Sequence, residues 1–202
     1  MTDATSDPDL YDSLDGQVAL VTGANRGIGR EIAVNLHDLG ATVFAATRSM
    51  THDVPDAWEH LLVDVTQEGE ISQAADDVFQ SAGRLDIVVN NAGIGEFGSD
   101  IVSESVETID RTLATNLRGP MLVCKHTVPL LLQTAPGRVV NPASAMGTPA
   151  DGHSGGPPAY RVSNTGMNGR TAHRHGDYAA ERQPAKPVCP GRVRTHMTGA
   201  DD

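Results

Sequence analysis

A glycine-rich segment between a short strand and a helix constrains this chain more than any other feature. Residues 17–22 are mostly apolar and β-branched, and residues 30–39 carry isoleucine and leucine at helical spacing. Between them lies Thr22–Gly29, with glycine at positions 23, 27 and 29. Glycine serves tight turns in general, but here it also lets the backbone approach phosphate oxygens at a helix N-terminus, which attracts anions. The segment therefore predicts a site for the pyrophosphate of a dinucleotide.

Apolar strands and helical segments alternate along the rest of the chain. Strands are expected at 17–22, 41–47, 61–65, 85–90, 138–141 and 185–189, and helices at 30–39, 71–81, 103–116, 119–133 and 159–180. Gly40 is expected to end the first helix, and Gly147–Pro158 to form a loop. This alternation is typical of a parallel sheet with helices on both faces. We predict one α/β domain over residues 15–202, preceded by a disordered lead-in over residues 1–14.

Composition restricts the partners of the chain. The formal net charge of −11 argues against nucleic acid or an anionic membrane surface as the main partner. Asp outnumbers Glu by 18 to 8, and Arg outnumbers Lys by 13 to 2. A salt-rich cytoplasm and high-GC codon usage explain this acidic protein equally well, so both explanations stay open. The polar N-terminus is neither a signal nor a transit sequence, and the most apolar run, 121–132, is too short to span a bilayer. We expect a cytoplasmic protein.

Cysteine and histidine give little sign of further chemistry. Cys124 and Cys189 predict buried thiols rather than a disulfide framework. The histidines at 153, 173, 175 and 196 have no metal-ligand spacing with acids or cysteines. We therefore expect no metal site.

Four motifs in order resemble the short-chain dehydrogenase/reductase family. They are the glycine turn Thr-Gly-x-x-x-Gly-x-Gly, Asp64 with Val65 after the third strand, Asn90-Asn91-Ala92-Gly93 after the fourth, and Pro190-Gly191-Arg192-Val193-Arg194-Thr195. The resemblance covers about residues 16–198 and implies a single-domain Rossmann fold, a doubly wound parallel sheet of about six strands, with oxidoreductase activity. The cofactor-binding residues that it implies, together with Arg48, are Thr22, Gly23, Asn25, Arg26, Gly27, Ile28, Gly29, Asp64, Val65, Asn91, Ala92, Gly93, Pro190, Gly191, Val193 and Thr195.

The end of the second strand indicates which dinucleotide binds. A carboxylate there would bond the adenosine ribose 2′-hydroxyl and repel a 2′-phosphate. The strand instead ends in Arg48, and Arg26 lies in the glycine turn. Two guanidinium groups can form charge-assisted bonds with a 2′-phosphate, and similar strand ends occur in NADP-using relatives. We expect NADP rather than NAD, although two solvated surface arginines would leave the same pattern.

The resemblance also implies a catalytic set for hydride transfer between a nicotinamide and a carbonyl or alcohol. Tyr160 is the expected acid/base, Ser144 would polarise the substrate oxygen, and Asn116 would hold a proton-relay water. The family has a lysine four residues after the tyrosine, which favours the phenolate and bonds the nicotinamide ribose. This position holds Asn164, which can bond ribose but carries no charge. A tyrosine titrates near pH 10 in water, so base catalysis at neutral pH should suffer.

Other departures lie nearby. If Tyr160 borders the buried face of its helix, positions 163, 167, 170, 171 and 174 should point inward, which suits Met167 but not Arg170 or Arg174. Pro184 and Pro187 would each remove a donor from the sixth strand. The family's last strand and substrate-covering helix would follow residue 198, so we expect part of the substrate pocket and of the homo-oligomer interface to be missing.

Two hypotheses follow. The first is an NADP-dependent short-chain oxidoreductase acting on a small carbonyl or secondary alcohol. The second is a degenerate nucleotide-binding relative, or a fragment, without catalytic activity, motivated by Asn164 and by the arginines on the helix.

Overall fold

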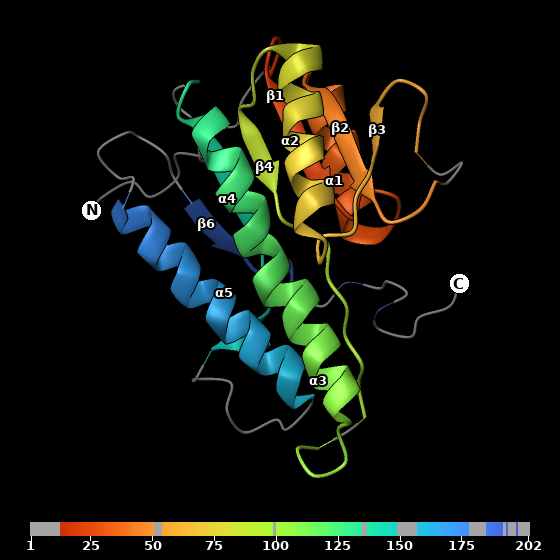
Figure 1. Cartoon of the computed structure of the whole chain (residues 1–202), viewed down its shortest axis with the longest axis vertical. Helices are drawn as coiled ribbons and strands as arrows, with labels where there is room; N and C mark the ends of the chain where they lie inside the picture. The colour runs from red at the N-terminus through yellow and green to blue at the C-terminus, as the bar shows by residue number, and fades with distance from the viewer. Residues whose placement is uncertain are drawn as a thin grey trace, which may run out of the picture.

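Six parallel strands form one sheet in the order β3-β2-β1-β4-β5-β6 (Figure 1). The computed structural model describes residues 13–50, 54–98, 100–134, 137–148, 157–177, 185–191, 193 and 197. The strands are β1 (Val18–Thr22), β2 (Thr42–Thr47), β3 (Glu59–Leu62), β4 (Ile87–Val89), β5 (Arg138–Pro142) and β6 (Ala185–Val188). This confirms the predicted single-domain, doubly wound α/β fold, whose strand order is that of a Rossmann sheet.

Helices cover both faces of the sheet. They are α1 (Gly27–Asp38), α2 (Glu68–Ala82), α3 (Val106–Leu113), α4 (Gly119–Leu131) and α5 (Pro158–Asp177). A π-helical turn, η1 (Ala114–Arg118), joins α3 to α4, and a 3₁₀ turn, η2 (Ala145–Gly147), follows β5. In Figure 1, α2, α4 and α5 lie in front of the sheet and α1 lies behind it. Within the described ranges, no helix combines the length and the hydrophobicity that crossing a bilayer requires.

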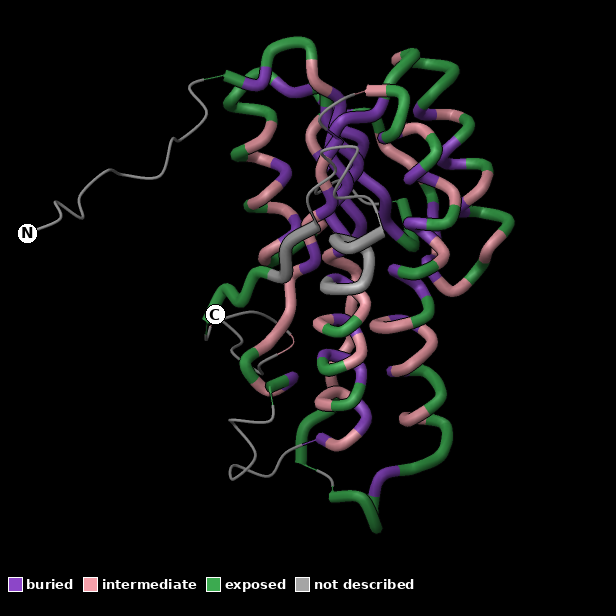
Figure 2. The backbone as a smooth tube through the Cα atoms, turned by 90° about the vertical axis from the view of Figure 1, so that its left-hand side faces the viewer, coloured by how far each residue is buried: buried purple, intermediate pink, exposed green. Residues whose placement is uncertain are grey.

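The core has two layers, one on each face of the sheet. Alternate residues of β1 separate into them, because successive strand side chains point to opposite faces. Val18 and Leu20 pack with α2 and α4, whereas Ala19 and Val21 pack with Ala33 of α1. Figure 2 shows the buried backbone concentrated in the sheet, with exposed stretches along the outer helices. Burial on both faces explains why the strands are continuous apolar runs.

Several boundaries differ from the prediction. The third strand was expected at 61–65 but occupies Glu59–Leu62, because the chain turns at Asp64, whose carboxylate Oδ1 accepts a bond from the Thr66 amide at 2.8 Å. The first helix begins at Gly27 rather than at residue 30. Gly40 follows its end with φ of 96°, as expected of a C-terminal glycine. The expected lead-in lies almost entirely outside the described residues, as does most of the loop after Gly147.

One prediction about the cysteines needs correction. Cys124 is buried as expected, but Cys189 is exposed, because it follows β6 at the edge of the sheet; both thiols are free. The predicted sixth strand is present as β6 and contains Pro187, whose missing donor is tolerated because β6 pairs with β5 on one side only.

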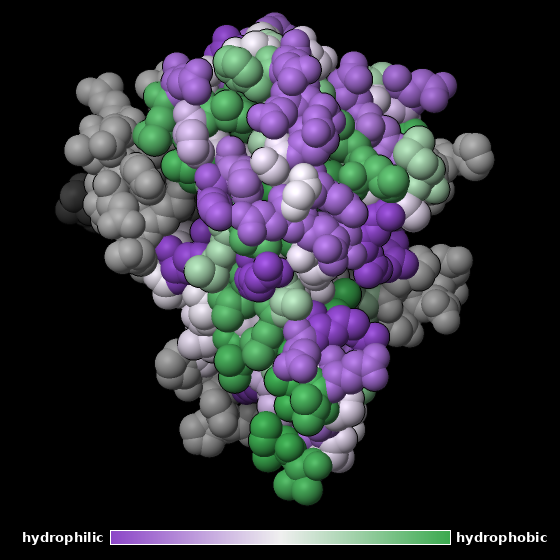
Figure 3. All heavy atoms as spheres, viewed as in Figure 1, coloured by the Kyte–Doolittle hydropathy of each residue, from purple (hydrophilic) through white to green (hydrophobic). Residues whose placement is uncertain are grey.

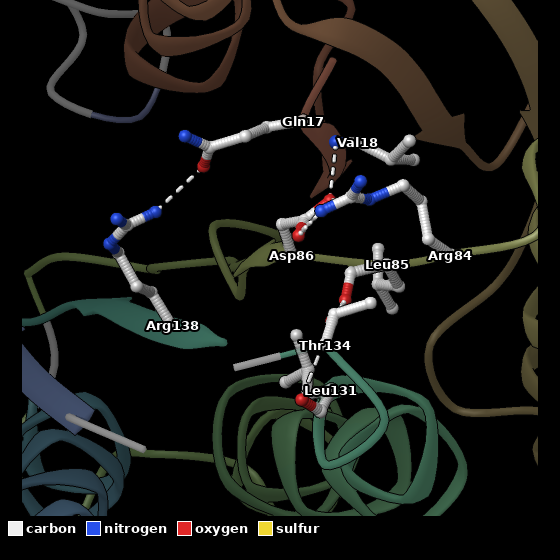
Figure 4. A network of polar contacts seen from close by, with 8 residues as sticks. All are labelled: Gln17, Val18, Arg84, Leu85, Asp86, Leu131, Thr134 and Arg138. Carbon is white, nitrogen blue, oxygen red and sulfur yellow. Dashed lines mark hydrogen bonds and ion pairs between the residues drawn. The ribbon is translucent and has the colours of Figure 1, made fainter. Parts of the chain in front are cut away.

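A polar network closes the amino end of the sheet (Figure 4). The Asp86 carboxylate accepts a bond from the Val18 amide at 2.9 Å and pairs with Arg84 at 2.7 Å. Hydrogen bonds and the charge of Asp86 raise the pKa of the Arg84 guanidinium above its usual value. Arg138 donates to Gln17 at 2.8 Å, so β5 is joined to the residue that precedes β1. These side chains join the amino ends of the strands. The carboxyl ends of the strands remain available for other groups.

Part of the front surface, at the end of the molecule that carries α3, is apolar. Figure 1 shows α3 and the start of α5 extending beyond the edge of the sheet, and Figure 3 shows apolar side chains gathered over that end of the molecule. Val106 on α3 is 72% exposed and Met121 on α4 is 51% exposed. Exposed apolar patches of this kind are uncommon on fully solvated helices.

Candidate dinucleotide and active site

The predicted site residues follow the strands at the carboxyl edge of the sheet. Thr22 ends β1, Arg48 follows β2, and Asn91 follows β4. Ser144 follows β5, and Pro190 follows β6. Because all six strands are parallel, these segments meet at one edge, where open α/β sheets bind their ligands.

The glycine turn has a backbone that other residues would not tolerate. Gly23 and Gly27 have φ of 68° and 55°, in the left-handed region that favours glycine. The Gly23 amide donates to the Ala46 carbonyl of β2 at 2.8 Å, which fixes the start of the turn. A methyl group on Gly29 would overlap the Asn91 side-chain amide and the Gly23 carbonyl. The start of α1 can approach an anion closely only with glycine at these positions.

Asn91 and Thr22 lock this turn from the neighbouring strand. The Asn91 side-chain amide donates to the Thr22 carbonyl at 3.0 Å and to the Gly23 carbonyl at 3.2 Å. The Ala92 amide donates to the Thr22 hydroxyl at 3.0 Å. The glycine turn and the Asn-Asn-Ala-Gly motif are far apart in sequence but form one unit. The Asn91 side chain supports the turn by bonding the backbone carbonyls of the turn.

The other predicted cofactor residues lie in the segments that follow β1, β2, β3 and β4. Arg26 and Arg48 are both exposed. The Asp64 carboxylate accepts a bond from the Thr66 hydroxyl within its own turn. Val65 is buried and packs against Gly119, so that a methyl group added to Gly119 would lie 3.0 Å from the Val65 side chain. Gly93 lies beside Asn116: a methyl group on it would lie 3.4 Å from the Asn116 amide oxygen.

Residues of the C-terminal motif and of the glycine turn line the same groove. Gly27, Ile28, Pro190 and Val193 line one apolar groove of about 560 Å³ that continues along α1. Gly191 is exposed with φ of 75°. Thr195 lies outside the described residues.

Tyr160 and Asn164 lie one helical turn apart near the start of α5. Asn164 is 7% exposed, and its side-chain amide donates to the Tyr160 carbonyl at 2.9 Å. The side chain that replaces the family's lysine is thus bonded to its own helix. Gly147 packs so closely that a methyl group on it would lie 2.7 Å from Asn164 Cβ. The position offers an amide and no positive charge.

Ser144 begins the η2 turn, which α5 holds in place. The Ser144 hydroxyl accepts a bond from the Met146 amide at 3.2 Å and so caps the turn. Arg161 of α5 donates to the Met146 carbonyl at 3.2 Å, and Thr165 donates to the Gly147 carbonyl at 3.1 Å. The elements that carry Ser144 and Tyr160 are therefore bonded together.

Asn116 lies in the π-helical η1 turn and bonds the loop after β4. Its amide oxygen accepts from the Ile94 N–H at 2.8 Å, and its NH₂ donates to the Ile94 carbonyl at 2.7 Å. The same NH₂ lies 3.4 Å from the Ser163 hydroxyl of α5. π-Helical turns within α-helices occur often at functional sites. Here the turn brings Asn116 between the loop and the Tyr160 helix.

The inner face of α5 matches the predicted register. Ser163, Met167 and Thr171 are buried. Arg170 is half-buried: its Nη2 lies 3.4 Å from Cys124 Sγ and from the Asn141 amide oxygen, while its buried Nε has no hydrogen-bond partner among the described residues. The side chain of Arg174 lies outside that part of the structure. The predicted conflict at Arg170 is therefore real, and the chain accommodates it with weak bonds.

Two residues near Tyr160 were not predicted. The Phe97 ring packs against the Tyr160 ring in a tilted arrangement, with centroids 5.6 Å apart. Glu104, only 9% exposed, accepts a bond from the Ala159 amide in the first turn of α5 at 3.1 Å. The chain has only three phenylalanines, and one of them lies four residues after Gly93; this was the sequence signal that could have identified Phe97. No local pattern marks Glu104, because its partner lies 55 residues away.

The fold and the locked glycine turn define a nucleotide-binding α/β protein, and comparison with known proteins identifies its family. The short chain dehydrogenase family model matches residues 17–202. The chain therefore belongs to the short-chain dehydrogenase/reductase family of oxidoreductases, whose members use NAD(P).

Individual relatives agree with this assignment. A 3-oxoacyl-[acyl-carrier-protein] reductase of Thermotoga maritima is 30% identical over 92% of this chain and 77% of its own length. An NADPH-dependent pterin aldehyde reductase of Arabidopsis thaliana is 32% identical over 65% of this chain and 57% of its own. The crystal structure of a short-chain dehydrogenase/reductase from Burkholderia xenovorans, 30% identical, superposes with a TM-score of 0.83 over 92% of this chain and 78% of that one.

Proposed function

We propose that this chain binds NADP(H) in the cytoplasm and catalyses hydride transfer between it and a small carbonyl compound or secondary alcohol. One observation carries the proposal: Asn91 fixes the glycine turn at the start of α1 through bonds to the Thr22 and Gly23 carbonyls. Amide N–H groups at a helix N-terminus bind a diphosphate well. The dinucleotide, when bound, supplies the hydride.

The residues near Tyr160 would handle the proton and orient the substrate. We assign the acid/base role to the Tyr160 phenol and the polarisation of the substrate oxygen to the Ser144 hydroxyl. The bonds from α5 to the η2 turn support this pairing, since they hold the two groups in one frame. Asn116 would position a relay water beside Ile94, and Asn164 would contribute an amide in place of a charge.

We assign NADP over NAD because two exposed guanidinium groups, from Arg26 and Arg48, lie in the segments after β1 and β2. The name of the pterin aldehyde reductase relative supports the same choice. Calorimetry should show NADP binding at least tenfold tighter than NAD. Arg48→Ala should reduce that ratio and leave NAD binding within about twofold, whereas NAD binding as tight as NADP would refute the assignment.

Catalysis is tested by following NADPH absorbance with a panel of aldehydes and ketones. The wild-type chain should oxidise NADPH in the presence of at least one of them. Tyr160→Phe keeps the ring and removes only the hydroxyl, so it should abolish turnover while leaving the dissociation constant for NADP within about twofold. Unchanged turnover in this variant would remove Tyr160 from the reaction.

A second candidate is a nucleotide-binding protein without catalytic activity. The observation that favours it is Asn164, whose side chain bonds its own helix and carries no charge. Asn164→Lys should raise turnover at pH 7 at least tenfold and extend activity to lower pH, because a nearby ammonium favours the phenolate. Asn168→Lys, one helical turn further on, is the matched control. Activity that appears only in Asn164→Lys would support this candidate, and robust wild-type turnover would eliminate it.

A further inference from the structure

An aromatic side chain lies against the proposed acid/base and remains partly exposed. The rings of Phe97 and Tyr160 are tilted by 56° with centroids 5.6 Å apart, a favourable geometry for an aromatic pair. Phe97 nevertheless remains 47% exposed. A large apolar side chain that is half in contact with Tyr160 and half accessible offers a surface for an apolar group bound beside the phenol.

The loop that carries Phe97 is bonded at two residues that precede the ring. The Ile94 N–H donates to the Asn116 side-chain oxygen at 2.8 Å, and the Asn116 side-chain NH₂ donates to the Ile94 carbonyl at 2.7 Å. Immediately before the ring, the Glu96 carboxylate pairs with Arg111 of α3 and accepts a bond from the Thr108 hydroxyl at 3.1 Å. These contacts attach the loop to α3 and η1. The ring is therefore held in place before any ligand arrives, which lowers the entropy lost on binding.

A second apolar side chain lies on the same side of the loop. A methyl group on Gly95 would lie 3.0 Å from the Phe97 ring and 3.4 Å from Met197 Cγ. Both side chains therefore contact the space that glycine leaves open at this position. Methionine is flexible and packs well on aromatic rings, so it can adjust to groups of different shape.

We propose that Phe97 and Met197 form an apolar wall that selects carbonyl compounds carrying an aromatic or similarly large apolar group next to the carbonyl carbon. The inference rests on the proposed function, since it assigns the substrate class of the same site. Phe97 is a specificity residue here: it contacts the part of the substrate that does not react, while Tyr160 faces the reacting oxygen. Substrates without an apolar group gain nothing from the wall.

The test compares Phe97→Ala with the wild type on acetophenone and on butanone, both with NADPH. We expect KM for acetophenone to rise about 20-fold in the variant, with kcat within about threefold, because an aromatic contact is lost from binding rather than from the chemical step. For butanone, kcat/KM should change less than threefold. Phe79→Ala removes a similarly exposed ring, 40% accessible, from α2 and is the matched control, which should behave as the wild type.

A binding measurement separates this inference from the proposed function. Titration of acetophenone into protein saturated with NADP⁺ should give a dissociation constant that is about 20-fold weaker in Phe97→Ala, whether or not turnover is detectable. If neither dinucleotide binds the wild type, the proposed function fails and the inference with it. If the dinucleotide binds but Phe97→Ala affects both ketones equally, or neither, the wall is refuted and the proposed function stands.

Discussion

The glycine turn and the start of α5 lie at the same edge of the sheet, yet they use their polar side chains differently. In the turn, Asn91 and Thr22 bond backbone atoms of neighbouring segments, and these bonds join the turn to the segment after β4. In α5, the Asn164 amide bonds the carbonyl one turn earlier in the same helix, and the Ser144 hydroxyl caps its own short turn. The bonds of the first region join separate segments of the chain, and those of the second stay within one helix or one turn.

This difference separates binding from proton transfer. A diphosphate needs backbone amides at a helix N-terminus, and Gly23 and Gly29 let the backbone there pack closely against Asn91. A phenol acting as a base near neutral pH needs a positive charge nearby, and Asn164 does not provide one. On the proposed roles, the turn serves dinucleotide binding and the residues near Tyr160 serve proton transfer, so variants in the two regions should have separable effects.

The largest expected effect comes from Gly29→Ala in the turn. The added methyl group would overlap the Asn91 amide and the Gly23 carbonyl, so Asn91 must rotate and release the turn. We expect the affinity for NADP, measured by calorimetry, to fall at least 100-fold. We also expect overpacking to lower the free energy of unfolding by about 1–3 kcal/mol.

Gly69→Ala is the matched control for this prediction. It lies in the first turn of α2, where a methyl group meets nothing within 4 Å, so binding should stay as in the wild type. If Gly29→Ala bound NADP with wild-type affinity, the turn would not be the dinucleotide site. The glycine turn could then no longer be contrasted, as a binding region, with the start of α5.

A smaller effect is expected from Glu104→Ala, which acts on the second region only. The buried carboxylate bonds the Ala159 amide at the start of α5, where it also interacts with the positive end of the helix. Its loss should lower the free energy of unfolding by about 1–2 kcal/mol, as for other caps and buried acceptors. Turnover should fall because Tyr160 follows Ala159, whereas the dissociation constant for NADP should stay within about twofold.

Two further variants sharpen this result. Glu104→Gln keeps an acceptor oxygen and should recover most of the lost stability in thermal unfolding, and Glu107→Ala, an exposed change on α3, should be close to neutral. A large loss of NADP affinity in Glu104→Ala would show that the two regions are coupled, contrary to the comparison above.

The two regions also differ in how far the sequence predicts them. The glycine turn, the alternation of strands and helices, and the inward position of Met167 follow from local periodicity and from motifs whose residues lie close together in the chain. The contacts of Glu104 and Phe97 with the start of α5 join segments that are more than 50 residues apart, and no local pattern encodes such pairs. The prediction placed the third strand too late in the chain. Val63 and Val65 are buried like strand residues, although both lie after the end of β3.

The smallest expected effect comes from Arg170→Met on the inner face of α5. Arg170 makes only long contacts, at 3.4 Å, with Cys124 and Asn141, and its buried Nε lacks a partner among the described residues. Methionine has a similar length and removes both the charge and the unpaired donor. Replacing a buried polar group by an apolar one of similar shape is often neutral or stabilising. The free energy of unfolding should therefore change by less than about 1 kcal/mol, towards higher stability.

Arg161→Met on the same helix is the control for this expectation, because Arg161 donates to the Met146 carbonyl and holds the η2 turn. Denaturant unfolding should show a loss of stability for Arg161→Met and none for Arg170→Met. A loss of several kcal/mol in Arg170→Met would mean that the guanidinium is a structural element of α5. The helix would then be built around that buried charge, and the irregular composition of the second region would be a requirement of its fold.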